Sequence, residues 1–184
     1  MVSARAVANS MRESMERVKA AEPVILKLLG GDRIMCVEGS DDEVLRMLDL
    51  TCGIDYFHVY DGRGLVRGVA SRFQTVSGGR GYDTFTVRKE RESGAATEYG
   101  KRKLAIAHGG EYPYLTMQAY VDSASGEVVS MGVARTVDIM AFIDAGMATV
   151  RRTGSAQVGQ ATFWVVPWAA LSGWGCDVRT YHAA

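Results

Sequence analysis

The chain has 184 residues, of which 47% are hydrophobic and 23% charged, and its formal net charge at pH 7 is zero. This length is typical of a single domain with a sizeable core. The balanced charge excludes a protein that binds polyanions over its whole surface, so any contact with nucleic acid needs a local basic patch.

The spacing of the cysteines and the length of the apolar runs indicate the cellular compartment. The three cysteines have no Cys-x-x-Cys spacing, which favours reduced thiols over a disulfide framework or a zinc site. No apolar run approaches the ~20 residues that span a bilayer, and the charged N-terminal stretch lacks the apolar core of a signal peptide. We therefore expect a cytoplasmic protein with no membrane partner.

The N-terminal part of the chain has a helical pattern. Apolar residues recur at three- and four-residue spacing from residue 3 to residue 29. Pro23 removes a donor from the helix interior and is expected to divide this segment into two helices. Ile34 to Val37 predicts a strand or a turn. Ser40 and Glu43 have the spacing of a capping box, which predicts a short helix after them.

The stretch from Gly53 to Gln74 predicts a β-hairpin. Its turn contains Asp61-Gly62 between two apolar runs, which is a strong hairpin signal. The second strand ends in alternating polar residues, which places Arg72 and Gln74 on one face. Since Asp55 precedes the first strand, the hairpin is expected to bring it next to both of these side chains.

The remainder of the chain predicts further strands and helices. Strands are expected at Thr84–Arg88, Tyr114–Val121, Glu127–Ala134 and Ala161–Trp168, and helices at Glu98–His108 and Val137–Ala145. Residues 150–160 predict a loop, and residues 169–184 a C-terminal tail. With an N-terminal helical segment at 1–30 and a core at 31–168, this order predicts one α/β domain with a mixed sheet flanked by helices.

This order of elements resembles the restriction-endonuclease-like superfamily, the PD-(D/E)XK nucleases. The resemblance covers residues 20 to 145, and extends as far as Trp168. It rests on a leading helix, a hairpin that follows Gly53-Ile54-Asp55, a second strand ending in polar residues, and a helix after it. In this superfamily two carboxylates, one heading the hairpin and one in its second strand, bind Mg²⁺, and a lysine two positions on helps to activate water. The resemblance therefore implies Mg²⁺ or Mn²⁺ as cofactor and phosphodiester cleavage as activity.

The chain departs from the superfamily at the second strand. Asp55 stands where the first metal ligand belongs, and the (D/E)-x-K positions fall on Arg72-Phe73-Gln74. A guanidinium cannot coordinate a cation, so either the second carboxylate comes from elsewhere or the site no longer cuts. Glu98, with Lys101 one turn on, is the best candidate for a migrated pair, and Glu90 is the next.

The resemblance thus implies a set of site residues. The catalytic residues are expected to be Asp55, Gln74, Glu98 and Lys101, with Asp55 and Glu98 as the metal ligands. The nucleic-acid-binding residues are expected to be Arg72, Arg80, Arg88, Lys89, Arg91, Arg102 and Lys103. DNA is favoured over RNA as the partner.

Each of these assignments has a structural alternative. Asp55 suits a residue that hydrogen-bonds a turn, and Glu98 with Lys101 has the spacing of a surface ion pair on a helix. The basic run from Arg88 to Lys103 is equally typical of a solvated face. Arg80 lies in a glycine-rich stretch that suits a plain turn better than a phosphate-binding loop.

Two further hypotheses concern origin and assembly. The runs Thr84–Arg88, Ser93–Glu98 and Tyr112–Tyr120 resemble uncharacterised proteins of phages and mobile elements, to which no function is attached. The chain also contains nine methionines, and Met11 and Met15 fall on one helical stripe. A homodimer or a protein-interaction module is therefore an alternative to a nuclease, as is a module that binds nucleic acid without cutting it.

Overall fold

The computed structural model describes residues 4–37, 40, 42–153 and 161–183, and of residues 4–15 only the helical backbone. The helices are α1 (Ala4–Leu29), α2 (Glu43–Met47), α3 (Glu98–His108), α4 (Thr136–Asp144) and α5 (Trp168–Gly173). Two short turns of other helix types follow α2 and β2: η1 (Leu48–Cys52) and η2 (Asp61–Arg63). The strands are β1 (Arg33–Cys36), β2 (Tyr56–Tyr60), β3 (Leu65–Val76), β4 (Thr84–Arg91), β5 (Leu115–Asp122), β6 (Val128–Arg135), β7 (Thr149–Thr153), β8 (Ala161–Pro167) and β9 (Val178–His182).

The strands form two sheets. The larger has six strands in the order β1-β2-β3-β5-β6-β9, and the smaller has the order β4-β8-β7. β3 and β5 are parallel, whereas the other neighbours in the large sheet are antiparallel. A parallel neighbour needs a crossover connection, and here the chain makes it through β4 and α3. This mixed arrangement confirms the α/β class.

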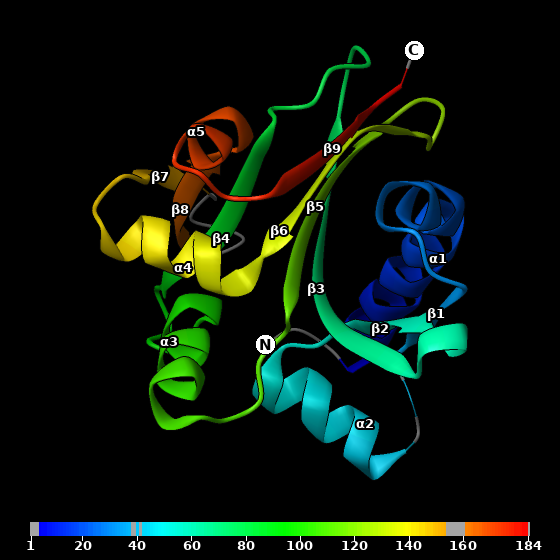
Figure 1. Ribbon diagram of the computed structural model, residues 1–184, viewed down its shortest axis with the longest axis horizontal. Helices are drawn as coiled ribbons and strands as arrows, with labels where there is room; N and C mark the ends of the chain where they lie inside the picture. The colour runs from blue at the N-terminus through cyan, green and yellow to red at the C-terminus, as the bar shows by residue number, and fades with distance from the viewer. Residues whose placement is uncertain (1–3, 38–39, 41, 154–160, 184) are drawn as a thin grey trace.

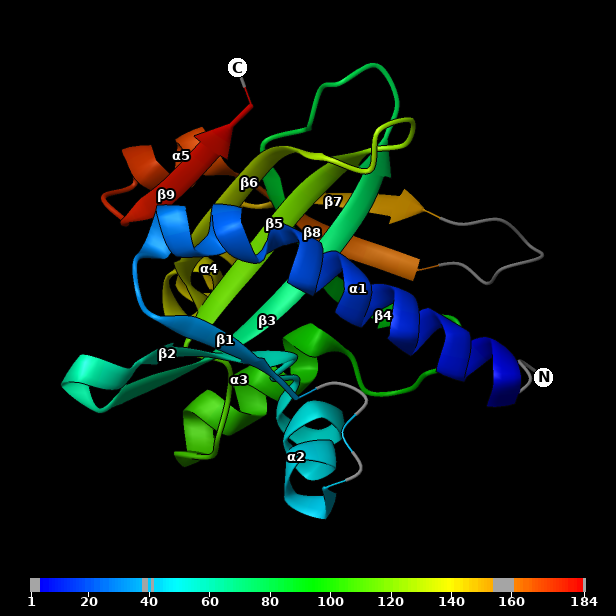
Figure 2. The same cartoon turned by 90° about the vertical axis from the view of Figure 1, so that its right-hand side faces the viewer.

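The large sheet is covered on both faces. α1 lies across one face, and α3, α4, α5 and the small sheet lie on the other (Figures 1 and 2). Because side chains alternate along a strand, each strand contributes to both cores. On β5, Met117 and Ala119 pack with Ile25 of α1, whereas Tyr120 packs with Phe85 of β4 and with α4.

Pro23 does not divide the N-terminal helix, which runs unbroken from Ala4 to Leu29. The prediction of two helices was therefore wrong. Ala21 and Ile25, on either side of the proline, are fully buried in the core beneath α1. Apolar burial on this scale offsets the hydrogen bond that a proline removes.

The predicted capping box was also wrong. Asp42 is the N-cap of α2, and its Oδ1 accepts from the backbone N–H groups of Val44 (2.9 Å) and Leu45 (3.1 Å). Ser40 instead accepts from the N–H of Asp42 at 3.2 Å. An aspartate caps as well as a serine, so the sequence offered two competing caps two residues apart.

The C-terminal part is more regular than expected. Residues 149–153, most of them expected in a loop, form β7, and residues 154–160 lie outside the described part. Residues 169–184, expected to be a tail, contain most of α5 and the whole of β9, which pairs with β6. β7 is exposed along its whole length, so it carries no alternating pattern from which a strand could be predicted.

The contact between β6 and α5 gives a test of the packing. A Cβ built on Gly132 would overlap ring atoms of Trp168, which is 3% exposed, whereas a Cβ on Gly173 meets nothing within 4 Å. We expect Gly132→Ala to lower the free energy of unfolding by about 1–3 kcal/mol, as overpacking does. Gly173→Ala is the matched control and should stay within about 0.5 kcal/mol. Equal denaturation midpoints for the two variants would contradict this packing.

Candidate functional site

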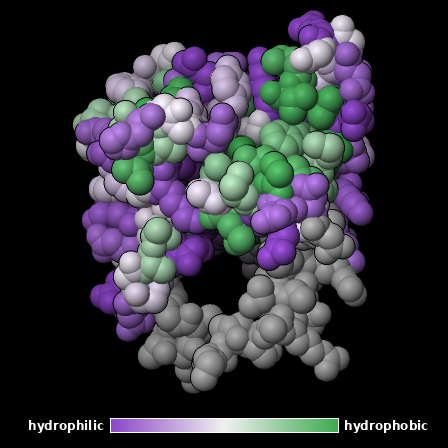
Figure 3. Space-filling view, turned by 90° about the horizontal axis from the view of Figure 1, so that it is seen from below, coloured by the Kyte–Doolittle hydropathy of each residue, from purple (hydrophilic) through white to green (hydrophobic). Residues whose placement is uncertain are grey.

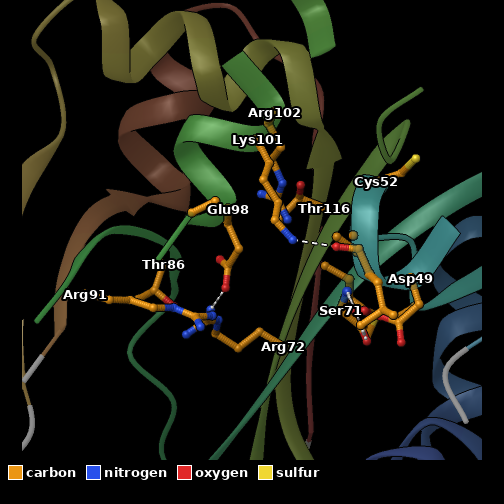
Figure 4. Close-up of a pocket in the computed structure, with 16 residues that line it drawn as sticks. Asp49, Cys52, Ser71, Arg72, Thr86, Arg91, Glu98, Lys101, Arg102 and Thr116 are labelled. Atoms are coloured by element: carbon orange, nitrogen blue, oxygen red, sulfur yellow. Dashed lines mark hydrogen bonds and ion pairs between the residues drawn. The ribbon is translucent and has the colours of Figure 1, made fainter. Parts of the chain in front are cut away.

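A cavity of about 360 Å³ opens between the head of the β2–β3 hairpin, η1, β4 and α3. Figure 4 shows charged side chains from these elements pointing into it. Its polar lining consists of the cations Arg72, Arg91, Lys101 and Arg102, the acids Asp49, Asp55 and Glu98, and the hydroxyls of Ser71, Thr86 and Thr116. The cavity therefore combines both signs of charge, which suits a ligand that carries negative charge together with a cation.

Asp55 is held in place by the hairpin. Its N–H donates to the carbonyl of Val69 at 2.9 Å, and its Oδ2 accepts from both the N–H and the hydroxyl of Ser71, the latter at 3.0 Å. Tyr56 pairs with Val69, so the register places Asp55 beside Ala70. The carboxylate is thus fixed against β3 at the open end of the hairpin. It shares a cavity with Arg72, as the sequence predicts, but not with Gln74, which was also expected beside it.

Glu98 is the first residue of α3, and its position follows from the helix cap. Thr97 is the N-cap: its hydroxyl accepts from the N–H of Gly100 (3.4 Å) and donates to the carbonyl of Lys89 on β4 (3.0 Å). Glu98 Oε1 forms an ion pair with Arg72 of β3, and its Oε2 accepts from the N–H of Arg88 at 3.2 Å. One side chain therefore joins α3 to strands of both sheets.

Neighbouring arginines keep the Glu98 carboxylate ionised. Burial acts to raise its pKa, but Arg72, Arg102 and Arg88 together outweigh burial and lower the pKa below its usual value. Glu98 is therefore ionised at neutral pH.

Arg102 links the two carboxylates electrostatically. It is 6% exposed, and burial lowers its pKa, whereas Glu98 and Asp55 both act to raise it. A buried guanidinium needs compensating negative charge. Because the field of both carboxylates acts on this one group, Asp55 and Glu98 belong to a single charged cluster.

Lys101 and η1 close the cavity on another side. Lys101 Nζ donates to the carbonyl of Leu50 at 2.5 Å, and Figure 4 shows its side chain bridging from α3 to that segment. The pKa of Asp49 is raised because burial outweighs the opposing effect of Lys101.

The cavity's surroundings are partly apolar. The underside of the molecule, where α2 and α3 lie in Figure 1, mixes hydrophobic with hydrophilic groups (Figure 3). Exposed apolar side chains on α2, η1 and α3 include Val44, Met47, Leu50 and Leu104, and Leu50 lines the cavity itself.

Most of the predicted site residues lie together. Asp55, Glu98 and Lys101, expected to be catalytic, line the cavity with Arg72, Arg91 and Arg102, which were expected to bind nucleic acid. Gln74 lines a neighbouring cavity instead, together with Arg72. Arg88 contacts Glu98 from β4, with its Nη1 3.9 Å from Oε1.

The other predicted cations are engaged elsewhere. Lys103 pairs with Asp144 at 3.1 Å on the outer side of α3. Lys89 pairs with Glu90 at 3.2 Å and lies over the ring of Trp164. Arg80 and Glu90 line neither of these two cavities. The basic run from 88 to 103 is therefore not one surface, because the strand and the helix turn its members in different directions.

Sequence reasoning missed Ser71, Thr116 and Asp49. Ser71 follows the residue that faces Asp55 across the hairpin, so the hairpin register is a signal that identifies it. Thr116 lies beside Ala70 only through the parallel pairing of β3 with β5. Asp49 lies on a turn of unusual helix type, for which the sequence gives no local signal.

The acidic side chains of the cavity bear on whether it can hold a magnesium ion. Within the described residues no group of three or more His, Cys, Asp or Glu side chains could hold a metal. Asp55 and Glu98 nevertheless line one cavity, and Mg²⁺ is commonly bound by one or two carboxylates together with waters and substrate phosphates. An ionised carboxylate has about four lone-pair sites, so the contacts of Glu98 with Arg72 and Arg88 leave acceptor sites on its carboxylate for a cation. The two carboxylates fit such an ion in chemical type.

No protein-family model, curated protein or solved structure matches the chain. Among the described residues no helix is long and apolar enough to cross a membrane.

The role of Glu98 in stability can be tested by Glu98→Gln. This change leaves Arg72, Arg88 and Arg102 without their shared anion, and we expect it to lower the free energy of unfolding at neutral pH by about 1–3 kcal/mol. Because the pKa of Glu98 is lower in the folded than in the unfolded chain, its stabilisation is present above the unfolded pKa and is lost as the pH falls through the folded pKa. The difference between variant and unmodified protein should therefore shrink in acid.

The matched control is Glu127→Gln, which changes an exposed carboxylate on the β5–β6 turn. It should shift stability by less than about 0.5 kcal/mol. Urea unfolding across a pH series measures both variants. A Glu98→Gln difference that is independent of pH would contradict the proposed electrostatic role.

Proposed function

We propose that the protein is a metal-dependent nuclease with a restriction-endonuclease-like core, and that Asp55 and Glu98 are its metal ligands. The observation that carries this proposal is that both carboxylates line one cavity with Arg72, Arg91, Lys101 and Arg102. Carboxylates for a hard cation and fixed positive groups for phosphate oxygens are what phosphodiester hydrolysis requires.

The arrangement of elements supports the fold part of the proposal. A leading helix, α1, precedes the antiparallel β2–β3 hairpin, and the chain then crosses through α3 to β5, parallel to β3. With β1 and β4 as additional strands, this order contains the leading helix, the hairpin and the following helix on which the resemblance rests.

The hairpin register supports a revised alignment with the superfamily. The residue beside Asp55 on the second strand is Ala70, and two positions on, on the same face, stands Arg72. We therefore place Ala70 in the position of the missing carboxylate and Arg72 in that of the lysine. Glu98, which reaches Arg72 from α3, would supply the carboxylate from another element.

The cavity residues would then have different roles in phosphodiester cleavage. When bound, the cation would polarise the phosphoryl group and lower the pKa of a water. Arg72 and Arg102, which stay protonated, would neutralise the charge that develops on the phosphate oxygens. Asp49, whose pKa is raised by burial, is the carboxyl best suited to transfer a proton, because a raised pKa lies closer to the working pH.

One observation favours a second candidate, a module that binds nucleic acid without cutting it. Glu98 Oε1 already pairs with the Arg72 guanidinium, its Oε2 accepts from the backbone N–H of Arg88, and Asp55 Oδ2 accepts twice from Ser71. In this alternative the guanidinium groups take the place of the metal and hold a backbone phosphate. Such a module should bind without metal, with an affinity that falls steeply as salt rises.

The interaction-protein alternative remains a prediction, because the side chains of Met11 and Met15 lie outside the described part of the structure. Cytoplasmic location, phage origin and the preference for DNA also remain predictions.

Cleavage assays test the proposal. Single-stranded, duplex and branched DNA and single-stranded RNA would be incubated with the protein in Mg²⁺, in Mn²⁺ and in EDTA. We expect cutting of at least one substrate that needs the cation. Asp55→Asn and Glu98→Gln should each reduce it by about 100-fold or more, since each removes a ligand of the cation that stabilises charge at the reacting phosphate.

Glu127→Gln again serves as the control and should cut at the unmodified rate, and folding of each variant would be checked by thermal unfolding. Binding without cutting, in any metal, would favour the second candidate. Cutting that survives both EDTA and the loss of Asp55 would refute the metal site.

A further inference from the structure

A second cavity, of about 290 Å³, adjoins the first. Arg72 and Thr86 line both, so the two cavities share a wall. The second lies between β3 and the three strands of the small sheet, and it carries two aromatic residues, Tyr82 and Phe163, with Gln74 and Arg151 as further polar groups.

The aromatic residues offer surfaces for a planar ligand. Tyr82 is 58% exposed, and its ring meets Tyr120 only edge-on, with centroids 5.7 Å apart. Phe163 lies beneath the guanidinium groups of Arg72 (5.1 Å to the ring centroid) and Arg88 (5.5 Å). Arg72 therefore connects Glu98 in the first cavity with an aromatic ring in the second.

Three polar side chains of the second cavity are available to a ligand. Within the described part of the structure, the side chains of Gln74, Arg151 and Tyr82 make no hydrogen bond or ion pair. An amide, a guanidinium and a phenol hydroxyl together supply donors and acceptors for the edge of a heterocycle. Beneath them, Thr86 donates to the buried Gln118 at 2.9 Å, and the Gln118 amide nitrogen has no partner among the described residues.

We propose that this second cavity takes one unpaired nucleobase of the strand whose phosphate lies in the first cavity. The inference rests on the proposed function and adds the substrate class: a single strand, or a duplex in which a nucleotide is unpaired. Ligand cavities of this size lie at the small end of the usual range of about 300–1,000 Å³, which suits a single base. A paired and stacked base would have to leave the duplex to enter.

Binding in EDTA tests the inference without cleavage. Fluorescence anisotropy would compare a labelled oligodeoxythymidine, a strand of equal length with the same sugar-phosphate backbone but no bases, and a perfect duplex. We expect the single strand with bases to bind about 5- to 100-fold more tightly than the strand without them, as stacking of one base on an aromatic side chain provides. It should also bind more tightly than the duplex.

Variants of the second cavity test which side chains bind the base. Tyr82→Ala and Gln74→Ala should weaken binding of oligodeoxythymidine and leave binding of the base-free strand unchanged. Tyr114→Ala is the matched control, since Tyr114 is 42% exposed and lines neither cavity. It should change neither affinity.

The outcomes separate the two proposals. Equal affinity of the unmodified protein for strands with and without bases would overturn the base cavity and leave the nuclease proposal standing. Failure to bind any strand in EDTA would overturn the base cavity, and the cleavage assays in Mg²⁺ and Mn²⁺ would then decide the nuclease proposal separately. The comparison of strands uses unmodified protein, so it remains decisive even where a variant does not fold.

Discussion

The structure depends on one carboxylate, that of Glu98, and the guanidinium groups that surround it. Arg72 comes from β3, Arg88 from β4 and Arg102 from α3 itself. These elements belong to the large sheet, the small sheet and the helix that connects them, so the cluster fixes how the crossover lies on the sheet. Arg102 is buried, and a buried charge is tolerated only with compensating partners. Asp55 is the other carboxylate that acts on Arg102, which ties the head of the hairpin to the same cluster.

This dependence explains why the site can be interpreted in two ways. Carboxylates that compensate buried arginines are also the groups that a hard cation prefers. The cluster can hold a cation or guanidinium groups alone. Which of the two occurs depends on whether Glu98 and Asp55 bind the cation or the guanidinium groups with the more favourable free energy. A phosphodiester would shift that balance, because its oxygens compete with the carboxylates for Arg72 and supply further ligands to a cation. Binding of a metal, a phosphate and the arginines would therefore be coupled in this cavity, and Arg72 also lines the second cavity.

The sequence predicts well what local rules determine. The hairpin turn at Asp61-Gly62, the bounds of α3 and the common face of Arg72 and Gln74 follow from turn chemistry, helical periodicity and strand alternation. It predicts poorly what depends on distant pairing. β7 and β9 are short and largely exposed, and their pairing with β8 and β6 defines them as strands. Likewise, Lys103 is adjacent to Arg102 in the sequence but contacts Asp144 of α4, which only the tertiary structure reveals. The link from Asp55 to Glu98 through Arg102 joins residues far apart in the chain, and spacing alone could not establish it.

Asp55 and Glu98 are proposed to act as one cation site. Titration with Mn²⁺, followed by the loss of its free electron-spin-resonance signal, measures this directly and needs no turnover. It would be done on the unmodified protein, on Asp55→Asn, on Glu98→Gln and on the double variant. If the two carboxylates share an ion, each single change should abolish nearly as much binding as the double change, because residues that act as a unit are not additive. Equal Mn²⁺ binding by all four proteins would contradict the claim.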